Sequence, residues 1–386
     1  MAKHLDELRG ATRLAIAATT GVTGLVEAMH RTIASGPAVL GSPLSGPARA
    51  LTGLVYGSVR WVAEQVGGAL DAALTQLQPL LGEAGSAPGP EREAVVAALN
   101  GVLGDYLAES GNPLALKMHL RSRGVPLALD QASLRAAFPS ASPRVLVLLH
   151  GSSMSDLGFT RNGHDHGTAL ARDLGVTPLY LSYNSGLHVS QNGAAFAQLL
   201  EQLVAAWPVP VEELALLGHS MGGLVARSAC ATRTPLKLRK LICLGTPHHG
   251  AALERAGSFV DRALGLSRYS APFARLGKIR SAGVTDLRHG NVRDEDWQGV
   301  GRFDHGADRR TPLPLPEGVA CYAAAATSDT AELSGDGLVS VDSALGRHAD
   351  PARTLHFQEQ WLGYGLGHLD LLDRPEVYET LRRWLQ

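Results

Sequence analysis

The chain has 386 residues, enough for one large catalytic domain and an additional region. The formal net charge is -1, from 35 Lys and Arg against 36 Asp and Glu, which argues against nucleic acid as a partner. The three cysteines, Cys230, Cys243 and Cys321, are too few for a disulfide framework and suit a reducing compartment.

The N-terminal residues do not predict an export signal or a membrane anchor. The chain begins Met-Ala-Lys-His-Leu-Asp-Glu, which is too acidic for the start of a signal peptide. The longest uncharged stretch there, residues 14–26, is shorter than the roughly 20 apolar residues that span a bilayer. We therefore expect a cytoplasmic protein and leave peripheral membrane contact open.

Residues 1–110 predict an N-terminal helical region. Apolar residues recur at steps of three and four along residues 8–33 and again along residues 51–77, and Gly/Pro/Ser-rich linkers separate these stripes. Val95, Leu99, Leu103 and Tyr106 predict a third helix. Such stripes favour a packed helical core, and a helix lying at a lipid interface is the alternative.

Residues 111–386 predict an α/β domain, because short apolar runs alternate there with helical patterns. Continuous Val, Ile and Leu runs are typical of parallel strands buried on both faces, so we expect a mostly parallel central sheet covered by helices on both sides. The predicted strands are residues 145–149, 178–181, 214–217, 241–244, 319–325 and 354–357, with an antiparallel hairpin from residues 117–121 and 126–129 at one edge.

Residues 218–223, Gly-His-Ser-Met-Gly-Gly, predict a nucleophile elbow with Ser220 as the nucleophile. A predicted strand leads into the motif and a helical run follows it, which is the setting such a turn requires. Gly218 and Gly222 leave room for the sharp turn on either side of His219 and Ser220. The alternative is an ordinary glycine-rich turn between a strand and a helix.

A nucleophilic serine needs a base and an orienting acid, which follow it in chain order on a sheet of this kind. Asp336 lies in a glycine-flanked turn after the predicted strand 319–325, and His368 ends a glycine-rich loop and is expected to open the final helix. The competing residues are Asp329 and Asp342 for the acid, and His348 and His356 for the base. Asp342 is the better candidate for a helix cap, and His356 falls within a predicted strand.

The oxyanion hole needs two backbone N–H groups close to the nucleophile. Met221, directly after Ser220, is expected to supply one of them. The second is expected from Ser152, because Gly151 lets the chain turn sharply after the strand that ends before His150. A plain turn at the end of this strand is the alternative.

Five segments together resemble bacterial lipases and esterases of the α/β-hydrolase superfamily, in particular the triacylglycerol-lipase-like branch. They are His150-Gly151, the motif at residues 218–223, Gly-Thr-Pro-His-His-Gly at 245–250, Asp-Gly-Leu-Val at 336–339, and Gly367-His368. The resemblance covers about residues 140–386. It implies an α/β-hydrolase fold, a triad of Ser220, Asp336 and His368, and oxyanion amides from Ser152 and Met221. The N-terminal helical region has no counterpart in the minimal fold of this family.

Residues 251–316 form a long insertion between two predicted strands and are expected to act as a cap or lid. The apolar side chains of Phe259, Tyr269 and Phe273 are expected to line a substrate pocket, together with His150 and Gly151. An apolar lid favours an ester substrate with an apolar acyl chain.

The segment Gly-His-Asp-His-Gly at residues 163–167 has residue types that bind zinc, but two histidine ligands alone make a poor site. A hydrogen-bonded loop is the favoured interpretation, and no metal or organic cofactor is expected. Residues 183–186, Tyr-Asn-Ser-Gly, are a candidate pocket wall.

We therefore expect a serine hydrolase that cleaves carboxylic esters through an acyl-enzyme intermediate. The alternatives are an acyltransferase or thioesterase that uses the same triad, and a non-catalytic binding protein with a hydrolase fold. The sequence does not indicate the oligomeric state.

Overall fold

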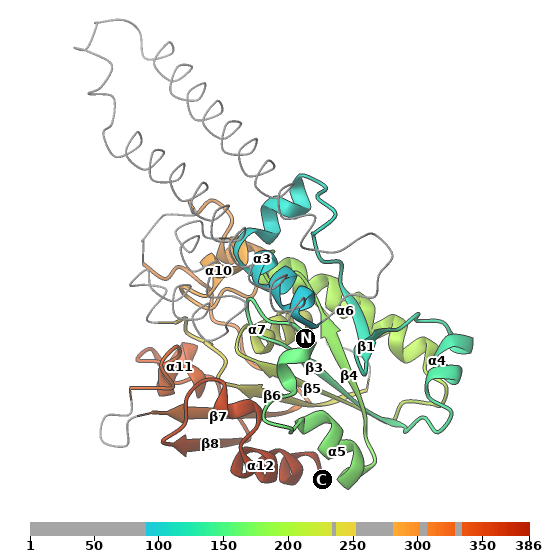
Figure 1. Cartoon of the computed structure of the whole chain (residues 1–386). Helices are drawn as coiled ribbons and strands as arrows, with labels where there is room; N and C mark the ends of the chain where they lie inside the picture. The colour runs from blue at the N-terminus through green and yellow to red at the C-terminus, as the bar shows by residue number, and fades with distance from the viewer. Residues whose placement is uncertain (1–89, 234–236, 252–280, 302–306, 329–333) are drawn as a thin grey trace, which may run out of the picture.

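The computed structural model describes residues 90–233, 237–251, 281–301, 307–328 and 334–386 (Figure 1). The helical stripes predicted before residue 90 and the pocket candidates Phe259, Tyr269 and Phe273 lie outside these ranges. Within the described ranges, every helix is too short or too polar to cross a membrane.

The centre of the structure is an eight-stranded sheet in the order β2-β1-β4-β3-β5-β6-β7-β8. The pairs from β4 through β8 are parallel, and β1 is antiparallel to both β4 and β2. In chain order the strands are β1 (His119–Ser122), β2 (Val125–Pro126), β3 (Arg144–Leu149), β4 (Thr177–Ser182), β5 (Glu213–His219), β6 (Leu238–Leu244), β7 (Ala320–Thr327) and β8 (Glu359–Tyr364).

Helices cover both faces of this sheet, as predicted. Alternate residues of β3 belong to two separate cores: Val145, Val147 and Leu149 pack on one face, and Leu146 and Leu148 pack on the other. This explains the continuous apolar runs, since neither face of the inner strands meets water. The first face is covered by α6 (Val189–Ala206) and α7 (Met221–Thr232), and the second by α5 (His166–Leu174) and α12 (Pro375–Leu385) (Figure 1).

Five of the six predicted parallel strands and the edge hairpin are confirmed, but the strand predicted at residues 354–357 is wrong. The last strand is β8, in which Glu359 pairs with Tyr322 of β7. β8 is an edge strand whose residues are mostly half-buried, so it lacks the continuous apolar run that marks an inner strand. The amide of Leu355 instead donates to the carbonyl of Gly346.

The third predicted helix is confirmed as α3 (Pro90–Glu109), and it is buried on several sides. It contacts the short helix α10 (Ala282–Asp286), which lies beside it in Figure 1. Its small residues allow close packing: a Cβ added at Gly101 would lie 2.7 Å from the Cα of Ser153. The predicted domain boundary at residue 110 stays a prediction.

Short elements complete the described part. They are α4 (Gln131–Ala137), α11 (Val341–Ala344), and the 3-10 turns η3 (Asp156–Phe159), η5 (Asp294–Asp296), η6 (Pro351–Arg353) and η7 (Asp370–Leu372). Two predictions are corrected here. Ser340, not Asp342, caps α11, because the Ser340 hydroxyl accepts from the Ser343 amide. His368 does not open the last helix: η7 intervenes, and α12 begins at Pro375, whose ring suits a first helical position.

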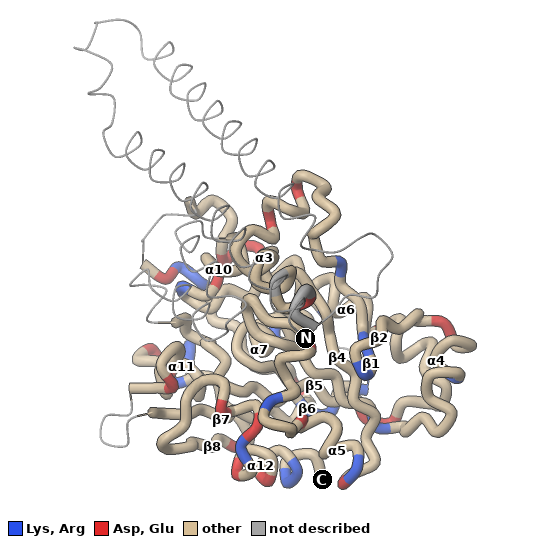
Figure 2. The backbone as a smooth tube through the Cα atoms, viewed as in Figure 1, with Lys and Arg blue, Asp and Glu red and all other residues tan. Residues whose placement is uncertain are grey.

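Charges are scattered over the described surface, with acidic and basic residues close together (Figure 2). This mixture agrees with the net charge of -1. All three cysteines are buried and unpaired, as their apolar surroundings in the sequence predicted.

Candidate active site

Ser220 lies on the sharp turn between β5 and α7, at the carboxyl edge of the sheet. Its backbone has φ 55° and ψ -125°, and a positive φ is costly for a residue with a Cβ atom, on the order of 1–3 kcal/mol. The turn is held from below, since the Ser220 amide donates to the carbonyl of Leu244 in β6 at 2.8 Å. The predicted serine therefore has the strained strand-to-helix geometry of a nucleophile elbow.

The glycines of the motif have the packing role predicted for them. A Cβ atom at Gly222 would lie 2.6 Å from the carbonyl oxygen of His150, so α7 could not approach β3 with any larger residue there. A Cβ atom at Gly218 would lie 2.5 Å from the Cα of Gly223. The start of α7 thus packs against the loop that carries the predicted oxyanion amide.

Asp336 and His368 lie side by side in the turns after β7 and β8. The Nδ1 atom of His368 is 2.7 Å from Oδ2 of Asp336, and the amide of His368 donates to the Asp336 carbonyl at 3.1 Å. The other carboxylate oxygen, Oδ1, accepts from the amides of Leu338 and Val339 at 3.0 and 2.8 Å. The carboxylate is fully buried, so these bonds fix its position and, through it, the imidazole ring.

Two further contacts hold the His368 ring against the elbow. The Nε2 atom of His219 lies 3.1 Å from the carbonyl oxygen of His368, and the two rings are 4.7 Å apart. A Cβ atom at Gly245 would lie 3.1 Å from Cε1 of His368. The Nε2 atom of His368 is buried and has no hydrogen-bond partner among the described residues. The nitrogen that a catalytic base uses is therefore not engaged by another side chain of that part.

The described competitors lie elsewhere. The Asp342 side chain is 76% exposed and stands 3.9 Å from Arg347, and His356 is exposed. His348 accepts the amide of Asp350 through Nδ1, and its ring lies 4.9 Å from that of His249. Asp329 lies outside the described residues.

The loop after β3 reaches the nucleophile, as expected for an oxyanion loop. A Cβ atom at Gly151 would lie 3.0 Å from the Cβ of Ser220, and the half-buried Ser152 follows it. The His150 ring stacks on Tyr183 at 4.3 Å, and burial lowers the pKa of His150 to about 4, so the ring is neutral.

The sequence did not reveal how this loop is supported. Ser153 has φ 59°, and its amide donates to the hydroxyl of the buried Ser185 at 3.0 Å. Asn184 ties the same segment to α3, since its Nδ2 donates to the carbonyl of Gly104 at 2.8 Å. The only sequence signal was the Tyr-Asn-Ser-Gly run after β4, which predicted a pocket wall. Its residues are buried and act instead as a frame for the oxyanion loop.

The loop at residues 163–167 is hydrogen-bonded, as favoured from the sequence. Nε2 of His164 lies 2.8 Å from Nδ1 of His166, so the two histidines engage each other. Asp165 caps α5 by accepting from the amide of Thr168 at 2.7 Å.

Comparison with known proteins agrees with this architecture. The family model described as a PGAP1-like alpha/beta domain matches residues 194–308, a segment that contains Ser220 but ends before Asp336 and His368. No curated protein matches the sequence.

Solved structures with a similar fold have low sequence identity. A mature lipase from Bacillus licheniformis is 17% identical, with a TM-score of 0.41 over 64% of this chain and 93% of the lipase. An esterase from a Rhodococcus species is 17% identical, with a TM-score of 0.40 over 64% and 92% of the two chains. The phospholipase PlaB from Legionella pneumophila is 17% identical, with a TM-score of 0.42 over 63% and 60%. The sheet order, the elbow and the order of the three site residues carry the assignment: the chain has the α/β-hydrolase fold, and the predicted resemblance to that superfamily is confirmed.

Proposed function

We propose that the protein hydrolyses carboxylic esters through an acyl-enzyme, with Ser220 as nucleophile, His368 as base and Asp336 as the residue that orients the base. The observation that carries this proposal is the buried 2.7 Å bond between Asp336 and His368 beside a serine on a strained turn. Ordinary structural roles do not require a serine at positive φ.

The first half of the reaction forms the acyl-enzyme. Nε2 of His368 takes the hydroxyl proton of Ser220 as Oγ attacks the ester carbonyl carbon. The carbonyl oxygen becomes negatively charged and accepts hydrogen bonds from the amides of Ser152 and Met221. The bond to the alcohol oxygen then breaks, and the alcohol leaves with the proton returned by His368.

The second half uses water in place of the serine. His368 takes a proton from water, whose oxygen attacks the acyl carbon, and the bond to Ser220 Oγ breaks as the serine recovers its proton. The acid is released. Asp336 stays ionised throughout and stabilises the imidazolium form of His368, which both halves require.

The environment favours this chemistry over competing proton transfers. Burial lowers the pKa of His219 well below its usual value, so the ring beside His368 stays neutral and adds no competing positive charge. The buried amides around Asp336 also hold its charge in a place that water does not screen.

For the substrate, we propose an ester with an apolar acyl chain, based on the apolar content of residues 251–316. An acyltransferase or a thioesterase with the same three residues is the second candidate, and it differs only in the acceptor or leaving group. We retain the cytoplasmic location and the cap role of residues 251–316 as parts of this proposal.

The test is hydrolysis of a p-nitrophenyl ester by the wild type and by Ser220→Ala and His368→Ala. We expect both variants to lose all but a trace of turnover while the near-ultraviolet circular dichroism is unchanged. The mass of wild-type protein trapped during turnover should increase by one acyl group. Retained turnover in Ser220→Ala would overturn the proposal, and acyl transfer to added alcohol in preference to water would favour the second candidate.

A further inference from the structure

Arg227 is a buried cation with no carboxylate partner. It lies in α7, two helical turns after Ser220, and is 5% exposed. Its Nη1 lies 3.2 Å from Nδ1 of His248, and its Nη2 donates to the carbonyl of Leu313 at 3.0 Å. Both acceptors are neutral. Among the described residues no Asp or Glu pairs with it, although a buried charge normally requires a counter-charge.

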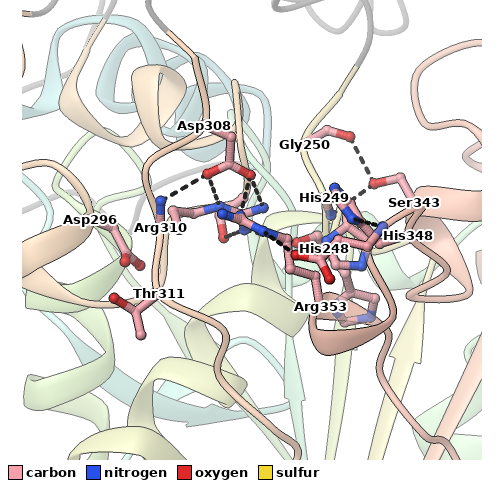
Figure 3. A network of polar contacts seen from close by, with 12 residues as sticks. His248, His249, Gly250, Asp296, Asp308, Arg310, Thr311, Ser343, His348 and Arg353 are labelled. Atoms are coloured by element: carbon pink, nitrogen blue, oxygen red, sulfur yellow. Dashed lines mark hydrogen bonds and ion pairs between the residues drawn. The ribbon is translucent and has the colours of Figure 1, made fainter.

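Two more arginines stand nearby and share one acid. Arg310 and Arg353 each lie 2.8 Å from Oδ2 of Asp308, as Figure 3 shows. Arg310 also donates to the carbonyls of His248 and Gly290 at 3.1 and 2.8 Å. The loop after β6 is thus enclosed by guanidinium groups.

The three guanidinium groups line one small cavity of about 20 Å³, together with His248, His249 and Asp296. That volume exceeds the roughly 10–15 Å³ needed to hold one water-sized particle. Asp296 is the single acid in this wall, and its Oδ2 already accepts the amides of Val292 and Arg293 at 2.9 and 3.0 Å. In Figure 3 it points toward Thr311.

His248 adds a donor to the same wall. Because its Nδ1 accepts from the N–H of Arg227, a neutral ring must carry its proton on Nε2. Burial lowers the pKa of His248 well below its usual value, which keeps the ring neutral. Its Nε2 atom is buried and has no partner among the described residues. A donor of this kind needs an acceptor.

The charges around the cavity do not cancel. Three arginines face the carboxylates of Asp308 and Asp296, so one positive charge remains without compensation. A monovalent anion would balance it and would accept from the Nε2 proton of His248. The cavity is too small for phosphate, sulfate or a carboxylate-bearing metabolite.

We propose that this cavity is a binding site for a single halide ion, chloride under cellular conditions, held chiefly by Arg227 and His248. The site joins α7, which begins directly after Ser220, to the loop at residues 245–250, whose Gly245 touches the ring of His368. Chloride therefore stabilises the contact between the nucleophile helix and the loop beside the base.

The test is thermal and denaturant-induced unfolding of the full chain in sodium chloride and in sodium gluconate at equal ionic strength. Chloride should lower the unfolding equilibrium constant by a factor of one plus the ratio of chloride to Kd, about elevenfold at ten times Kd. Bromide should replace chloride, whereas sulfate should not. Arg227→Gln should abolish the difference between the two salts. Arg347→Gln, which removes a half-exposed arginine outside the cavity, should preserve it.

A second measurement does not depend on a stable variant. Crystals of the wild type grown in sodium bromide should show an anomalous peak within hydrogen-bond distance of Arg227 and His248. Equal stability in chloride and gluconate, or a water molecule without anomalous signal at this position, would overturn the proposal. Neither measurement uses catalytic activity, so the halide site can fail while the proposed hydrolase function holds.

Discussion

Replacing Asp336 with Asn tests how the site orients its base. The amides of Leu338 and Val339 both donate to Oδ1, so an asparagine must keep its carbonyl oxygen there and turn its NH₂ group toward His368. Nδ1 of His368 must then accept instead of donate, and the ring proton moves to Nε2. The nitrogen that should take the proton of Ser220 is thereby blocked.

The expected loss in kcat is on the order of 10⁴-fold, which corresponds to roughly 5 kcal/mol of activation free energy. The fold should survive, because both backbone hydrogen bonds to the side chain are kept and only the bond to His368 loses its charge. We expect the free energy of unfolding to fall by about 1–2 kcal/mol. The assay is p-nitrophenyl ester hydrolysis, with urea unfolding measured on the same preparations.

Asp342→Asn is the matched control. It makes the same chemical change on an exposed side chain of α11, so kcat should stay within about twofold of the wild type. A greater loss in Asp342→Asn than in Asp336→Asn would refute the reasoning and move the acid to the neighbouring segment. So would an Asp336→Asn variant that keeps a tenth of wild-type turnover.

Three more predictions follow from the described contacts and from the sequence. Ser185→Ala removes the acceptor of the Ser153 amide and should lower kcat about tenfold with KM unchanged, because only the oxyanion loop shifts; a change confined to KM would contradict this positioning role. Burial lowers the pKa of His166 to about 4, below its unfolded value near 6.5, so the free energy of unfolding should decrease as pH falls from 6.5 to 4. His166→Asn should flatten that slope in urea titrations, and an unchanged slope would assign it to other groups. In a series of p-nitrophenyl esters, kcat/KM should rise up to about fourfold per methylene, at about 0.8 kcal/mol each, to an optimum near six to ten carbons. Phe259→Ser should shift the optimum to shorter chains, whereas a steady decline from acetate onward would exclude an acyl channel.

The inner sheet could be predicted from the sequence because its strands are buried on both faces. β3 contributes alternate residues to two cores, so all of its positions are apolar and the run is easy to recognise. β8 could not be found this way. It lies at an edge, its residues are mostly half-buried, and its pairing with β7 depends on tertiary contacts that the local pattern does not encode.

The three candidate catalytic residues could be proposed from the sequence because each lies in a glycine-rich turn after a predicted strand. The frame around them could not be. Gly104 of α3 binds Asn184, a residue 80 positions later in the chain, and neither residue type signals that contact. Arg227 likewise appears in the sequence as one charge in an apolar helix, and its lack of a carboxylate partner became visible only in the fold.

The most direct test of the account is covalent labelling by a fluorophosphonate probe, which reacts with a serine only where a base and an oxyanion hole activate it. The account predicts one equivalent of label on the peptide that contains Ser220, with labelling lost in Ser220→Ala and strongly slowed in His368→Ala. Absence of labelling in the folded wild-type protein, or equal labelling of Ser220→Ala, would contradict the assignment of Ser220 as an activated nucleophile.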